Sequence, residues 1–199
     1  PVDDAIHYLR GLAHEDKNQP SKAAVAFRKV FEQDTTILKW RARVRQAHNL
    51  ADAEKYAEAL PLLEEIAANF DAYPRRHRIL YQRAVALENL DRPDAAARAY
   101  QQAWFEFPHK PEGKKARKAL TRLSEAGHAP SPIAQRKLYQ RFRRLRINKH
   151  WPLAEKLFLE LKEQNATQSG HSAFEHDILM QLALNDFVPQ NYEEALEWL

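Results

Sequence analysis

A small residue followed four positions later by a large apolar one recurs along this chain, each time just after a polar turn. In three of the cases a second small residue stands twelve positions before the first: Gly11, Ala47 and Ala84. Small residues at both places let two antiparallel helices approach closely, and the large residue fills the space beside them. The pattern predicts helical hairpins, which must stack because one hairpin cannot bury its apolar face alone. The five pairs are Ala23/Phe27, Ala59/Leu63, Ala96/Tyr100, Ala154/Phe158 and Ala195/Leu199.

The spacing of these hairpins predicts the architecture. Successive alanines of the pattern are 36, 37, 58 and 41 residues apart, and the long gap leaves room for an extra helix at 112–126. No alternating β-branched run indicates a strand. We therefore expect an all-α fold, a right-handed superhelix of antiparallel helix pairs (an α-solenoid) that forms a single repeat region over 1–199, with polar joints at 127–132 and 165–171. The expected pairs span about 4–33, 39–70, 77–107, 133–164 and 174–199.

The third hairpin resembles a tetratricopeptide repeat at the small, large and closing-proline positions of that family. The matching residues are Ala84, Leu87, Ala96, Tyr100, Ala103 and Pro108. This resemblance implies an adaptor that binds a segment of a partner protein.

A second resemblance covers 78–161. A hairpin closed by the run 99–108 is followed by a basic helix, a proline-containing linker and an arginine-rich helix that leads into 150–158. This order is similar to the superhelical N-terminal region of soluble lytic murein transglycosylases. It implies a periplasmic, non-catalytic scaffold that positions peptidoglycan for a lysozyme-like domain, although a cytoplasmic location stays open. That domain cuts with a glutamate followed by serine. No Glu-Ser pair occurs here, and the last helical pattern runs to Leu199 without a stop signal, so we expect a fragment with its catalytic domain beyond Leu199.

Positive charge is concentrated in one segment. Thirteen basic and two acidic residues lie between Lys110 and His150, a net charge of +11 in a chain whose total is +4, so the rest carries −7. Such a segment would attract peptidoglycan or another anionic polymer, or it could pair with acidic parts of the protein itself. Nucleic acid is disfavoured as a partner because no recognised binding module is present.

The inner wall of a stacked-hairpin superhelix is formed by the first helix of each pair. The repeat register turns aromatic and guanidinium side chains toward this wall, a mixture suited to stacking on sugar or peptide and to holding carboxylates. The predicted ligand-groove residues are Tyr8, Arg41, His48, Arg78, Tyr81, Arg136, Tyr139, Arg143 and Arg146.

Other site chemistries are not indicated. The chain has no cysteine, and His48 and Asp52, four residues apart, make only two ligands of a metal site, so no metal and no cofactor are expected. No nucleophile elbow or glycine-rich phosphate loop is present, and no catalytic residue is predicted. No apolar run approaches the ~20 residues of a membrane span. The four tryptophans lie near repeat boundaries, which favours a role in packing between hairpins.

Overall fold

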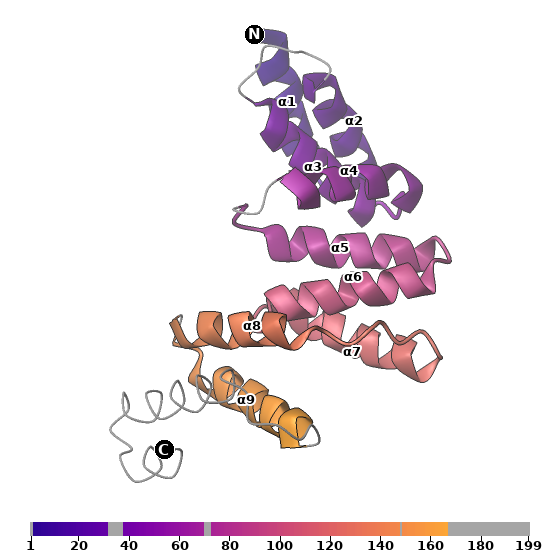
Figure 1. Cartoon of the computed structure of the whole chain (residues 1–199). Coiled ribbons are helices and arrows are strands. Elements are labelled where there is room, and N and C mark those ends of the chain that lie inside the picture. The colour runs from indigo at the N-terminus through magenta and orange to yellow at the C-terminus, as the bar shows by residue number, and fades with distance from the viewer. Residues whose placement is uncertain (1, 32–37, 70–72, 148, 167–199) are drawn as a thin grey trace. The chain divides into compact units, whose positions relative to one another are not determined.

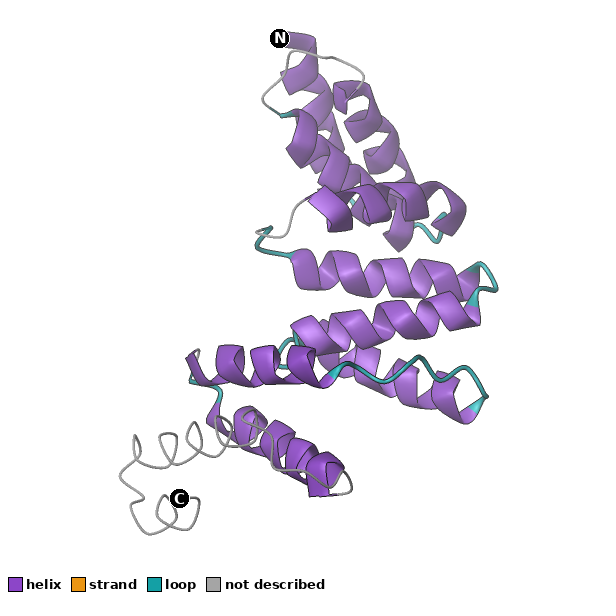
Figure 2. Ribbon diagram, in the orientation of Figure 1, coloured by secondary structure: helices purple, strands orange, loops and turns teal. Residues whose placement is uncertain are grey.

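The computed structural model describes residues 2–31, 38–69, 73–147 and 149–166, and throughout these residues every regular element is an α-helix (Figure 2). The predicted all-α fold is therefore confirmed. None of the helices in this part of the chain is long and apolar enough to cross a membrane. The helices are α1 (Val2–Asp16), α2 (Pro20–Phe31), α3 (Lys39–Asp52), α4 (Tyr56–Asn69), α5 (Arg76–Asn89), α6 (Pro93–Glu106), α7 (Pro111–Glu125), α8 (Gln135–Ile147) and α9 (Trp151–Ala166).

The chain divides into two compact units, Pro1–Ser131 and Pro132–Leu199. In unit 1 each helix from α1 to α7 packs against the next (Figure 1). Contacts also join α3 to α5, the first helices of two successive pairs, and α5 to the extra helix α7. This is the stacking of an α-solenoid. In unit 2, α8 packs against α9. A single superhelix over 1–199 stays a prediction, and the expected fifth pair, 174–199, lies outside the described residues.

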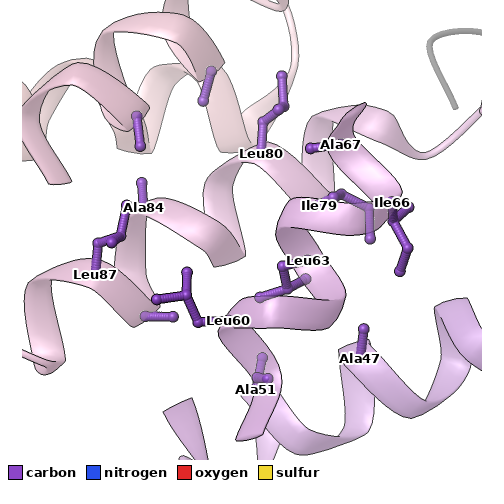
Figure 3. Packing of buried hydrophobic residues seen from close by; sticks show 14 of the residues in the cluster. Ala47, Ala51, Leu60, Leu63, Ile66, Ala67, Ile79, Leu80, Ala84 and Leu87 are labelled. Carbon is purple, nitrogen blue, oxygen red and sulfur yellow. The ribbon is translucent and has the colours of Figure 1, made fainter. Parts of the chain in front are cut away.

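The small residues of the repeat pattern lie where the helices of a pair approach most closely. A Cβ atom added to Gly11 would stand 2.5–2.8 Å from ring atoms of Phe27, so only glycine fits beside that ring. In the next two hairpins alanine takes this place and the main core continues through α3 to α7 (Figure 3). The alanines of the pattern in unit 1 are fully buried: Ala23, Ala47, Ala59, Ala84 and Ala96.

The turns inside the helix pairs share one backbone geometry that the sequence reveals only in part. In each turn one non-glycine residue adopts the left-handed conformation, with φ between 51° and 59°. The N–H of Glu54 donates to the carbonyl of Ala51 (3.1 Å) and the N–H of Lys55 to that of Leu50 (2.9 Å), which is a Schellman motif at the end of α3. The left-handed residue lies five positions before the small alanine in four pairs. These residues are Asn18, Glu54, Asp91 and Lys149.

Candidate ligand groove

Unit 1 contains a groove of about 840 Å³ that is lined chiefly by α3, with further residues from α1 and α5; these are the first helices of three successive pairs. We call it the ligand groove. Because the first helices supply its wall, it lies where the repeat register places a recognition surface. Its lining residues are Tyr8, Glu15, Asn18, Gln19, Pro20, Trp40, Arg41, Val44, Arg45, His48, Asn49, Asp52, Tyr73, Arg75 and Arg78.

Four of the predicted groove residues are brought together here: Tyr8, Arg41, His48 and Arg78. The fifth predicted residue of unit 1, Tyr81, is not in the lining. Its ring packs on that of Tyr100, with the ring centroids 5.9 Å apart.

The other four predicted residues belong to α8 in unit 2 and do not line the ligand groove. Arg143 is exposed and Arg146 is half-buried. The side chains of Arg136 and Tyr139 lie outside the described part of the structure.

One polar network ties α1 to α3 within the groove. Arg45 forms an ion pair with Glu15 and donates a hydrogen bond from Nε to the Tyr8 hydroxyl (3.2 Å). Asn49 donates from Nδ2 to the other oxygen of Glu15 (2.6 Å). The Arg45 guanidinium also lies 5.9 Å from the centroid of the Tyr8 ring, within cation–π range. Both oxygens of Glu15 are therefore engaged, and the Tyr8 ring is fixed in orientation.

A second network ties α3 to α5. Asp52 accepts hydrogen bonds from Arg78 (2.6 Å) and from Gln82 Nε2 (2.9 Å). With the amide nitrogen of Gln82 donating to Asp52, its oxygen faces His48 and accepts the proton of Nδ1. In neutral His48 the other ring nitrogen, Nε2, is then an acceptor, and it is buried with no hydrogen-bond partner among the described residues.

Burial sets the charge of His48. Its side chain is 7% exposed, and this desolvation lowers its pKa from 6.5 to about 4, against the opposing effect of the hydrogen bond with Gln82. Nearby Arg78 also disfavours the charged ring. His48 is therefore neutral near pH 7. Rather than sharing a metal, His48 and Asp52 are bridged by Gln82, and the described residues contain no group of three or more side chains that could hold one.

Two guanidinium groups remain for a ligand. Arg45 and Arg78 are paired with Glu15 and Asp52, whereas Arg41 and Arg75 are exposed and form no ion pair with a described residue. Around them lie aromatic side chains, of which Trp40 is 43% exposed. The groove can therefore hold carboxylates with its free arginines and stack flat aromatic faces on a ligand.

Several groove residues escaped the sequence prediction. Arg45 and Asn49 stand four residues after Arg41 and Arg45 on α3, so extending the inward-facing register along this helix would have found them. The sequence favours a packing role for Trp40, yet its side chain is 43% exposed. Tyr73 and Arg75 precede α5, where the helical register says nothing about direction.

The basic segment is partly compensated by the protein itself. On α7, Arg122 pairs with Glu88 of α5. The exposed cations earlier on α7 form no ion pair with a described residue, and these are Lys114, Lys115, Arg117 and Lys118. Internal pairing of the segment is thus shown at Arg122, whereas its attraction of an anionic polymer stays a prediction.

Comparison with known proteins assigns no family. No family model matches the sequence, and no curated protein matches it either.

Proposed function

We propose that this chain is a non-catalytic binding module whose ligand groove holds peptidoglycan for a catalytic domain elsewhere in the same protein, as in a periplasmic lytic transglycosylase. The observation that carries the proposal is the presence, in one groove, of aromatic side chains, of which Trp40 is exposed, and of two guanidinium groups without counter-charges. Peptidoglycan presents the matching chemistry, since its sugars are joined to short peptides that bear carboxylates.

Arg41 and Arg75 give the groove two positive charges that its own carboxylates do not engage. Four arginines and two carboxylates line the groove, and the two carboxylates are occupied by Arg45 and Arg78. The other two guanidinium groups can each take a ligand carboxylate in a bidentate pair. Because the groove's own pairs are already formed, a ligand gains these contacts without breaking internal ones.

The aromatic ring of Tyr8 is held in a fixed orientation by its neighbours. The Tyr8 ring meets the buried Phe27 ring edge to face, with centroids 5.5 Å apart, and its hydroxyl accepts a hydrogen bond from Arg45. An aromatic face held in this way costs little conformational entropy when it binds a flat sugar ring. Trp40 adds a larger exposed face in the same groove.

The groove suits binding better than catalysis. Each of its two carboxylates accepts two hydrogen bonds within the protein, Glu15 from Arg45 and Asn49, and Asp52 from Arg78 and Gln82. Neither is free to exchange a proton with a substrate. In this proposal the cleaving glutamate belongs to the other domain.

A second candidate is a tetratricopeptide-like adaptor for an acidic, extended segment of a partner protein. It is favoured by the lining of the groove, because three successive first helices offer one continuous surface to an extended chain. The same two free arginines would then hold acidic side chains of the partner.

The test is co-sedimentation with purified peptidoglycan sacculi. The wild-type chain should sediment, and Arg41→Glu/Arg75→Glu should reduce the bound fraction by about tenfold or more, since two favourable ion pairs become repulsive. The matched control is Arg92→Glu/Arg98→Glu, at two exposed arginines outside both the groove and the basic segment, which changes the net charge equally and should sediment like wild type.

Two results would count against the peptidoglycan proposal. If the wild type does not sediment, the proposal fails, and the adaptor candidate is then tested by binding of acidic peptides to the same variants. If the Arg92→Glu/Arg98→Glu control loses as much binding as the groove variant, the attraction is general and the groove is not the site.

A further inference from the structure

A second hollow, of about 390 Å³, lies along the seam between α1 and α2. We call it the basic furrow. Its cationic and imidazole side chains are His7, Arg10, His14, Lys22, Lys29 and Lys55.

Helical spacing explains why these side chains meet. Residues 7, 10 and 14 are three and four positions apart, so they share one face of α1, and residues 22, 25, 26 and 29 do the same on α2. The two helices pack against each other, which makes these faces the two walls of the furrow. Lys22 and Lys29 are seven residues apart, so the lysines of α2 are separated by about 10 Å along the helix.

No carboxylate lines this furrow. Arg10, Lys22 and Lys29 form no ion pair with any residue that the structure describes. Lys55 has Glu58 3.8 Å away, but the two side chains are 42% and 59% exposed, so this pair compensates little. Four permanent positive charges therefore share one small hollow, in a chain whose part outside 110–150 carries a net charge of −7.

One further observation points to an anionic ligand. Ser21 lines the furrow in the first turn of α2, where the helix dipole favours negative charge.

We propose that the basic furrow binds a ligand that carries two or more closely spaced phosphate groups. A single carboxylate would neutralise one of the four cations, whereas a chain of phosphates can reach the cations at both ends of the furrow. Lysines also suit phosphate oxygens as compact point charges, while the arginine forks of the ligand groove suit planar carboxylates. The volume is that of a small-molecule site.

The experiment is a calorimetric titration of the 199-residue chain with tripolyphosphate at 150 mM NaCl, an ionic strength chosen to screen exposed charges. We expect saturable binding to one site. Lys22→Gln/Lys29→Gln should weaken it by about tenfold or more, because each lost cation removes a charge-assisted contact. The matched control, Lys114→Gln/Lys118→Gln on α7, removes the same charge and should bind within about twofold of wild type.

A vesicle arm identifies the source of the phosphates. Binding to vesicles that contain phosphatidylglycerol, lost in the furrow variant, would support the site with a lipid surface as its ligand, whereas binding to tripolyphosphate alone would support a soluble one. Absence of both, or equal losses in the furrow and control variants, would overturn the proposal. The groove variant Arg41→Glu/Arg75→Glu should keep its tripolyphosphate binding, so this test and that of the ligand groove fail independently.

Discussion

The ligand groove and the basic furrow both use α1 but differ in how far their charges are compensated. In the groove, Glu15 and Asp52 are each held by an arginine and an amide, so two of the four lining arginines are compensated before a ligand arrives. In the furrow no carboxylate lines the wall, and the one ion pair of its cations among the described residues is the exposed pair Lys55–Glu58. A partly compensated surface selects ligands by geometry as well as by charge, whereas a largely uncompensated one selects by charge and depends steeply on salt. Adjacent residues of α1, His7 and Tyr8, thus line two hollows of different charge.

The largest effect should come from Phe27, which supports α1 and therefore both hollows. Its side chain is completely buried, lies against Gly11 and meets Tyr8 edge to face. Phe27→Ala should lower the free energy of unfolding by about 3–5 kcal/mol, because it leaves a large cavity. Urea denaturation followed by circular dichroism measures this loss.

The control for this prediction is Leu9→Ala on the same helix. Leu9 is 62% exposed, and its replacement should change the unfolding free energy by less than about 0.5 kcal/mol. Similar losses in the two variants would mean that Phe27 does not anchor α1.

An intermediate effect is expected from His48, which belongs to the groove alone. The unfolded chain takes up a proton on this imidazole near its ordinary pKa of 6.5, while the folded chain does so only near 4. Between these values the unfolded state binds more protons, so stability falls as the pH is lowered. From pH 7 to pH 5 the wild type should lose about 2 kcal/mol more than His48→Gln.

Denaturation series at the two pH values test this prediction. A His48→Gln chain that loses stability as steeply as wild type would show that His48 is protonated in the folded protein.

The smallest predicted effect is a change in the free energy of unfolding whose sign differs between the two hollows. Lys29→Gln in the furrow relieves repulsion and should stabilise the fold by up to about 0.5 kcal/mol at low salt, with the gain vanishing at 1 M NaCl. Glu15→Gln in the groove weakens a compensated network and should instead destabilise by about 1 kcal/mol. Thermal unfolding at both salt concentrations measures the difference, and the same sign for both variants would contradict the comparison.

Much of the fold could be predicted from the sequence because closely packed helices need small residues at their points of contact. The small residues at 11, 23, 47, 59, 84 and 96 indicated the pairs of unit 1, and the extra helix expected at 112–126 is α7 at Pro111–Glu125. The boundary between the units falls after Ser131, within the expected joint 127–132. The left-handed turn residues could be predicted only in part, because asparagine and aspartate are enriched in this conformation whereas glutamate and lysine are not.

Residues of the ligand groove could be predicted only where they lie on helices. Tyr8, Arg41, His48 and Arg78 followed from the inward register of their helices, whereas Tyr73 and Arg75 lie in a segment without such a register. The low pKa of His48 depends on burial between α3 and α5, which no single segment of sequence encodes. The furrow likewise requires the lateral alignment of α1 with α2.

The turn inside each helix pair has a consequence for how such a chain can grow. In unit 1 the left-handed residue recurs after 36 and then 37 residues, always five positions before the alanine that seats the next helix. A segment that runs from one left-handed residue to the next contains one complete module, and the turns at its two ends have the same geometry. Duplicating this segment would add one first helix to the inner surface and leave the neighbouring modules in register. The length of that surface is therefore set by the number of modules.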